Sequence, residues 1–135
     1  METIVNKVAE SGIITLDLAP YVQVGDIAAF DLKPFLFREM ILREKDYRAA
    51  LQAYDWTTLA GKQVAVFCSV DAIIPVWAYM LAAVYLQPVA ACVYYGTEAE
   101  LTNKLVNDQI AGIDIAEYAD KRVVIKGCGD TPIPD

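Results

Sequence analysis

The chain has 135 residues, of which 56% are hydrophobic and 21% charged, enough to bury a core without disulfides or metal and too apolar for a disordered chain. Its net charge is −7 and its 11 basic residues form no run, which excludes electrostatic binding to nucleic-acid phosphates. Histidine is absent, which excludes a Ser-His-Asp triad, a Cys-His pair and a His-ligated zinc within one chain.

The first third of the chain predicts a short helix and two strands. Residues 4–9 favour a helix that ends at Gly12, and residues 13–18 alternate as a strand does. Pro20 marks a turn, and residues 27–32 then predict a second strand, antiparallel to the first.

From Pro34 the apolar residues recur every three or four positions, which is typical of an amphipathic helix. We expect a helical stretch over 34–54 with a break near Lys45 and Asp46, and the charges from Arg38 to Arg48 on its solvated face. The apolar positions are Phe35, Leu36, Met40, Ile41, Tyr47, Leu51 and Tyr54.

The middle of the chain is its most apolar part. Residues 64–68 form a continuous apolar run, which is typical of a strand buried on both faces. Asp71 is suited to a position near a helix N-cap and Pro75 to the first turn, so residues 75–86 predict a helix.

Two more strands and a helix follow. Residues 89–95 predict a strand, the sequence Thr97-Glu-Ala-Glu100 is a capping box for a helix through about residue 110, and residues 123–125 predict another strand. Strands that alternate with helices in this order imply right-handed crossovers and parallel pairing.

Residues 72–96 carry no charge, so a membrane span is the alternative to a buried helix. The helix over 75–86 would be about 18 Å long, too short for a hydrocarbon core of about 30 Å, so we predict no membrane span. Because a helix that is apolar on every side must be covered on every side, we expect a homodimer with Trp77, Tyr79 or their neighbours near the interface.

Part of the chain is repeated. Residues 55–75 and 114–134 share the order Lys, Val, Cys, Asp, Ile, Pro. We therefore predict a single mixed α/β domain over residues 1–135, in which one single-layer mixed sheet is flanked by helices and contains both repeated strands, 64–68 and 123–128, each with its Cys at the carboxyl end. The prediction includes a partial strand, Cys, Asp, Pro duplication.

The repeated Cys and Asp residues are the candidate site, because open α/β sheets bind ligands at the carboxyl ends of their strands. The candidate ligand-binding residues are Cys68, Ser69, Asp71, Cys128 and Asp130. Three interpretations are open: buried thiols with helix-capping acids, a ligand pocket without catalysis, or thiol chemistry. The Cys and Asp spacing fits no zinc ribbon, so neither a metal nor a cofactor is predicted. Cys92 is expected in the core and Cys68 to be unreactive.

The aromatic residues allow two interpretations. Trp77, Tyr79 and Tyr85 lie near one stripe of the predicted 75–86 helix, which favours a core or subunit contact over base stacking. Tyr94 and Tyr95 precede Gly96, and the alternative is that they line a cleft at a strand end.

Four segments resemble an uncharacterised bacterial family known as domain of unknown function 2480. They are Cys68-Ser-Val-Asp-Ala-Ile-Ile-Pro-Val-Trp-Ala-Tyr-Met80, Leu86-Gln-Pro88, Glu2-Thr-Ile-Val-Asn-Lys-Val and Val124-Ile-Lys-Gly-Cys128. The resemblance covers nearly the whole chain and implies no activity. It implies that family members continue past Pro134 with another apolar helix and a Cys-containing tail, so this chain is expected to be incomplete at its C-terminus.

We expect a cytoplasmic oligomeric protein, because the chain lacks the features of a signal peptide and its three cysteines cannot all pair. The predicted role is a binding module for a small ligand or a protein. The alternatives are a small thiol-dependent enzyme that uses Cys68 or Cys128, and a structural subunit of a larger assembly.

Overall fold

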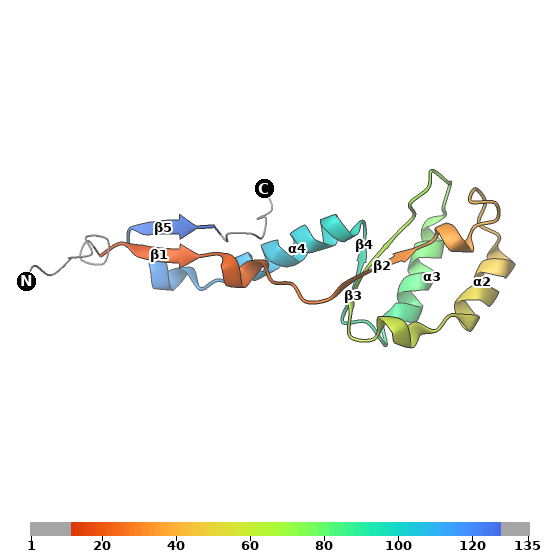
Figure 1. The fold of residues 1–135 in the computed structure, drawn as a ribbon, viewed down its shortest axis with the longest axis horizontal. Helices are drawn as coiled ribbons and strands as arrows, with labels where there is room; N and C mark the ends of the chain where they lie inside the picture. The colour runs from red at the N-terminus through yellow and green to blue at the C-terminus, as the bar shows by residue number, and fades with distance from the viewer. Residues whose placement is uncertain (1–11, 128–135) are drawn as a thin grey trace, which may run out of the picture. The chain divides into compact units, whose positions relative to one another are not determined.

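The computed structural model describes residues 12–127, and the predicted helix over 4–9, Cys128 and Asp130 lie outside them. The chain groups into two compact units: residues 25–103, called here the central unit, and residues 1–24 with 104–135, called the terminal unit. The described residues form a mixed α/β structure with three α-helices and five strands, all paired in parallel in two small sheets (Figure 1). The predicted α/β class is confirmed, but the predicted single mixed sheet is wrong.

The sheet of the central unit has the order β2-β3-β4, with β2 at Ile27–Asp31, β3 at Gln63–Phe67 and β4 at Cys92–Tyr95. Helix α2 at Glu44–Ala53 connects the first two strands, and α3 at Val76–Leu86 connects the last two. Such crossovers place the consecutive strands of this sheet parallel. Segment 13–18 belongs to the other sheet and does not pair with 27–32, so the predicted antiparallel pairing of these two segments is wrong.

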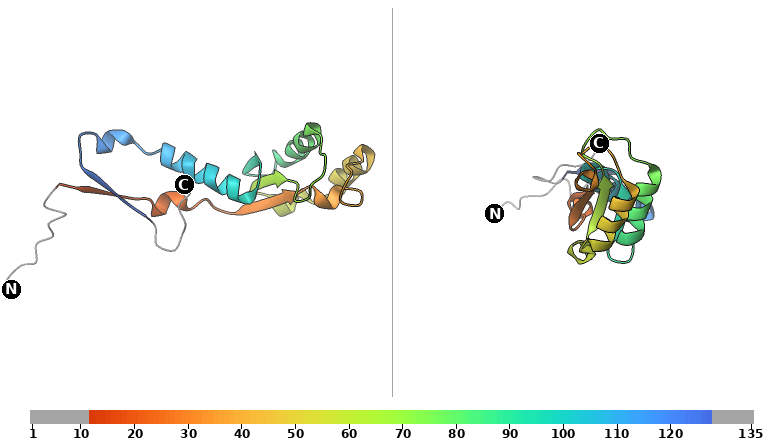
Figure 2. Two further views of the ribbon diagram at one scale, coloured as in Figure 1. Left: turned by 90° about the horizontal axis from the view of Figure 1, so that it is seen from above. Right: turned by 90° about the vertical axis from the view of Figure 1, so that its right-hand side faces the viewer.

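The core of the central unit lies between this sheet and both helices. The end-on view in Figure 2 shows the two helices on one side of the sheet. Phe30 of β2 and Val64 and Val66 of β3 pack in one buried cluster with side chains from each helix. The two helices therefore cover the same face of the sheet. The helical members of the cluster are Tyr47, Leu51, Ala78, Ala82 and Leu86.

Between a 3-10 turn at Lys33–Phe35 and α2 the chain is not helical, contrary to the prediction of a helical stretch from Pro34 onward. Arg38 and Glu39 have positive φ angles of 51° and 57°, and Phe37 and Ile41 form an antiparallel bridge around them. A left-handed backbone at two successive residues interrupts any right-handed helix, so α2 begins only at Glu44.

Helix α3 is confirmed and begins one residue after Pro75, which is its N-cap. Asp71 does not cap it, because the N-cap has no side-chain hydrogen bond. Helix α4, at Glu98–Ala111, begins with the predicted capping box, in which the Glu100 N–H donates to Thr97 Oγ1 over 3.2 Å.

The terminal unit contains the second sheet, in which β1 at Ile14–Asp17 pairs in parallel with β5 at Val123–Lys126. Both predicted strands of the repeat therefore form, but β3 and β5 belong to different sheets and the expectation of a shared sheet is wrong. The two strands have different neighbours: β3 pairs with β2, whereas β5 pairs with β1.

The segments before β3 and β5 have the same local structure. Asp55 caps a 3-10 turn at Trp56–Leu59 by accepting from the Thr57 N–H, and Asp114 caps a turn at Ile115–Tyr118 in the same way. Gly61 and Asp120 follow with φ angles of 72° and 57°. Each strand begins two or three residues later.

The segments after β1 and β2 are also alike. Asp17 Oδ1 accepts from the Ala19 N–H over 3.0 Å, and Asp31 Oδ1 accepts from the Lys33 N–H over 2.9 Å. A 3-10 turn with a proline in its first two positions follows each acid. Among residues 12–127, no helix is long and apolar enough to cross a membrane.

Candidate functional site

The carboxyl ends of β3 and β4 open into a cleft of about 350 Å³. Strand β3 ends beside it with Phe67, which Cys68 follows, and β4 ends beside it with Tyr95. The α3 side chain of Tyr79 forms another wall. Parallel strands end at one edge of a sheet, and that edge is where open α/β sheets bind ligands. The remaining lining residues are Gly96, Thr97 and Glu100.

Asp31 ends β2 at the same edge of the sheet. Its Oδ1 accepts from the backbone N–H groups of Lys33 and Ser69, over 2.9 and 3.0 Å. Burial raises the pKa of Asp31, but the hydrogen bonds from the Ser69 hydroxyl and these two N–H groups outweigh it, so the pKa lies below its ordinary value. The carboxylate therefore ties the end of β2 to the segment that follows β3.

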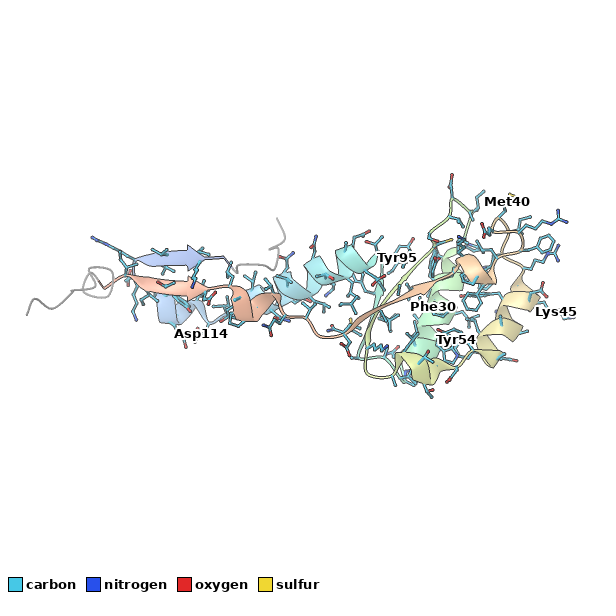
Figure 3. The ribbon with its side chains drawn as sticks, in the orientation of Figure 1. Phe30, Met40, Lys45, Tyr54, Tyr95 and Asp114 are labelled. Atoms are coloured by element: carbon cyan, nitrogen blue, oxygen red, sulfur yellow. The ribbon has the colours of Figure 1, made fainter. Side chains whose placement is uncertain are left out.

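Tyr79 and Tyr95 form an edge-to-face pair with ring centroids 4.7 Å apart. Figure 3 labels Tyr95 at the end of β4. Burial raises the pKa of Tyr79, and the charges of Tyr95 and Cys68 and a side-chain hydrogen bond with Tyr95 raise it further. The Tyr79 phenol is therefore neutral near pH 7, when it can donate and accept hydrogen bonds.

Gly96 joins β4 to α4 with a φ angle of 151°, and its N–H donates to the Val66 carbonyl over 3.0 Å. A Cβ at this position would lie 2.6 Å from Tyr94 Cε1 and 3.0 Å from Glu100 Oε2. The cleft therefore needs glycine here, both for the backbone angle and for space.

A larger groove of about 570 Å³ lies beside β4 and shares Tyr79 and Tyr95 with the cleft. Cys92 lines this groove and is half-buried, so its predicted place in the core is wrong. The two tyrosines separate the groove from the cleft. The other lining residues are Val66, Ala83, Gln87, Ala90, Ala91 and Val93.

The structure brings two of the predicted site residues together. Cys68 lines the cleft, with its Sγ 3.5 Å from the Val70 carbonyl oxygen, and the next residue, Ser69, donates its N–H to Asp31 Oδ1 at the end of β2. Asp71 is exposed and lines a different hollow, with Met40 and Ile73. The structure places no described residue of the second copy in the cleft, since Cys128 and Asp130 lie outside the residues described.

Tyr79 and Glu100 line the cleft, and Asp31 ends β2 at the same edge of the sheet, without being predicted as site residues. Asp31 had a usable signal, because an acid that ends an apolar strand can bond to the backbone that follows. Tyr79 had none, since a tyrosine within an apolar helix is usually core. The alternative interpretation that Tyr94 and Tyr95 line a cleft is confirmed for Tyr95, whereas Tyr94 is not among the lining residues.

The aromatic residues of α3 do not share one face. Tyr79 faces the cleft, Tyr85 stacks on Trp56 at a centroid distance of 5.2 Å, and Trp77 lies 6.1 Å from the Tyr47 ring. In the described part of the chain, no three Cys, Asp or Glu residues gather as metal ligands.

A family model described as a protein of unknown function (DUF2480) matches residues 2–135, which confirms the resemblance seen in the sequence. No curated protein and no solved structure matches the chain. The residues of the cleft are therefore the basis for assigning a role.

Proposed function

Since the chain belongs to the DUF2480 family, whose function is unknown, we propose from its own residues that it is a binding module for a small ligand. The observation that carries the proposal is the cleft at the carboxyl ends of β3 and β4, where Cys68, Tyr79, Tyr95 and Glu100 meet. A concave site with an aromatic wall and a few convergent polar groups is the usual form of a ligand pocket.

The lining favours a ligand with a positive charge and an apolar ring. Tyr79 and Tyr95 offer aromatic surface, and the Glu100 carboxylate and Thr97 hydroxyl offer acceptors. None of the described lining residues is positively charged. A cation is attracted both by a carboxylate and by an aromatic ring, whereas an anion would meet Glu100 uncompensated.

The test compares three ligands that share one ring: benzylamine, benzyl alcohol and benzoate. The thermal midpoint of the full chain is measured against the concentration of each. Because a ligand that binds only the folded state raises stability in proportion to its affinity, we expect the largest rise with benzylamine, a smaller one with benzyl alcohol and none with benzoate.

The matched variants are Glu100→Gln, in the cleft, and Glu98→Gln, in the same helical turn but outside the lining. Glu100→Gln should reduce the rise in thermal midpoint with benzylamine to the rise seen with benzyl alcohol. Glu98→Gln should leave both rises unchanged. Equal responses to all three ligands, or equal effects of the two variants, would contradict the proposal.

We also propose that the chain forms a homodimer through the outer face of α3. Val76, Met80 and Val84 recur every four residues on this helix and are exposed, and Ile73 just before it is 94% exposed. An uncharged row of this kind supports a contact with a second copy, because monomers rarely leave large contiguous apolar patches uncovered.

We also propose a partial internal duplication and a cytoplasmic location. The shared turn, cap and strand before β3 and β5 support a partial internal duplication. The free thiols of Cys68 and Cys92 support the cytoplasm as the compartment, because reducing conditions keep thiols unpaired.

A further inference from the structure

Strand β5 is paired on one side only within the described residues, and its apolar side chains are exposed. Val123, Val124 and Ile125 are 36%, 50% and 64% exposed, whereas the corresponding Val64 and Val66 of β3 are 0% and 2% exposed. Parallel sheets are normally covered, and a sheet of two strands is marginal by itself. The terminal unit thus presents an incomplete sheet.

The hydrogen bonds to β1 identify which backbone groups of β5 face outward. The Ile14 N–H donates to the Arg122 carbonyl over 2.8 Å, and the Leu18 N–H donates to the Lys126 carbonyl over 3.1 Å. Backbone groups of alternate residues point to opposite edges of a strand. The N–H and C=O groups of Val123 and Ile125 therefore point away from β1.

Strand β3 shows what can occupy such an edge. Its Phe67 carbonyl accepts from the Leu32 N–H on the β2 side, as Lys126 does for β1. On its other side, Lys62 and Val66 accept from Ala91 and Gly96, around the parallel strand β4. That neighbour is the uncharged sequence Cys-Val-Tyr-Tyr, followed within three residues by Glu98.

Charge selects between two strands that could add to β5. Lys121, Arg122 and Lys126 surround its apolar residues. A second β5 in antiparallel register about Val124 would place Arg122 opposite Lys126 of the other copy, and like charges directly opposite destabilise a strand pair. An uncharged strand with an acid after it would instead place that acid near Lys126.

We infer that the outer edge of β5 is an acceptor for an added β-strand: an uncharged apolar segment that runs parallel to β5 and is followed by an acidic residue. The inference rests on the proposed duplication and is independent of the proposed ligand cleft. Main-chain hydrogen bonds to Val123 and Ile125 provide the affinity in this mode of recognition, and side-chain pockets provide the specificity.

The test uses a synthetic peptide with the sequence of residues 90–100 and Ser in place of Cys92, added to the isotope-labelled full chain. We expect the amides of Val123 and Ile125 to exchange rapidly with solvent in the chain alone and to become protected at least tenfold with the peptide. A control peptide with Tyr94→Pro should give no protection, because the N–H of residue 94, like that of Gly96, faces the acceptor strand and proline removes this donor.

Two protein variants complete the test. Ile125→Pro removes an outward N–H and should abolish peptide binding while the β1 amides stay protected, whereas Ile125→Thr keeps the N–H and should bind. Three results would overturn the inference. The amides of Val123 and Ile125 could be protected from exchange in the chain alone, or the peptide could change only the signals of β4. The third is that Ile125→Pro abolishes self-association of the chain. The duplication itself would still stand if peptide binding failed while β1 and β5 remained paired.

Discussion

Tyr47 shows how one residue holds α2 against α3. Its side chain is fully buried, and its hydroxyl donates to the Ala78 carbonyl over 2.6 Å. Burial, together with the charge of Tyr79, raises the pKa of Tyr47 to about 12. The ionised form is therefore disfavoured in the folded state relative to the unfolded chain, where a phenol titrates near 10.

This shift predicts a loss of stability at high pH. The pKa of Tyr47 is higher in the folded state than in the unfolded chain. The stability that neutral Tyr47 contributes is therefore fully present below about pH 10 and is lost as the pH rises toward about 12. Tyr47→Phe should cost about 1 kcal/mol at pH 7 through the lost hydrogen bond. It should also make unfolding free energy less dependent on pH between about 10 and 12, as measured by urea unfolding. An identical pH dependence in both proteins would contradict the role of Tyr47.

At the scale of elements, the turn between β4 and α4 determines whether the cleft exists. Gly96→Ala combines a backbone angle that L-residues rarely adopt with a contact of 2.6 Å to the Tyr94 ring. We expect a destabilisation of about 1–3 kcal/mol, measured by urea unfolding, together with loss of the benzylamine response.

Gly61→Ala is the matched control for this substitution. Gly61 also has a positive φ angle, 72°, but a Cβ there would meet no atom within 4 Å. Its cost should therefore be the smaller one, about 1 kcal/mol for the left-handed angle alone, with benzylamine binding unchanged. If the Gly61 variant were the less stable of the two, the steric argument for Gly96 would be wrong.

The elements that the sequence predicts well are those with a strong local signal. The apolar run of β3, the uncharged α3 and the capping box at Thr97 each lead to the observed element. The turn after Phe37 was unpredictable, because Arg38 and Glu39 adopt left-handed angles that no glycine marks. Strand pairing also depends on distant residues, so the separation of β1 and β5 from the other sheet has no local signal.

Only part of the candidate site could be predicted, because the rest depends on how distant segments pair. Cys68 directly follows a recognisable strand, and Tyr95 ends another. Asp31 and Glu100 reach the same edge through the order in which the strands pair and through the start of α4, which are tertiary properties. Asp71 is near Cys68 in sequence but lies in an extended segment that leads away from the cleft.

At the scale of the whole molecule, the exposed row on α3 predicts self-association. The inner row, Ala78, Ala82 and Leu86, is already buried against the sheet, so the outer row can be covered only from outside the central unit's core. Tyr79 faces the cleft and is not part of this surface, whereas Trp77 lies at its margin. A two-fold contact between α3 helices would bury mainly apolar area, with Glu44 and Arg48 beside the row, and stable dimers bury about 800 Å² per partner.

The final prediction is therefore that the chain is a dimer at micromolar concentration and that Met80→Glu makes it a monomer. A carboxylate in the centre of the row would be buried in each copy next to its symmetry mate, and an unpaired buried charge is strongly unfavourable. Ile115→Glu is the control, because Ile115 is equally apolar and 81% exposed but lies in the terminal unit. Sedimentation equilibrium measures the mass of each protein. A monomeric parent chain, or dissociation caused by Ile115→Glu and not by Met80→Glu, would show that α3 is not the contact surface.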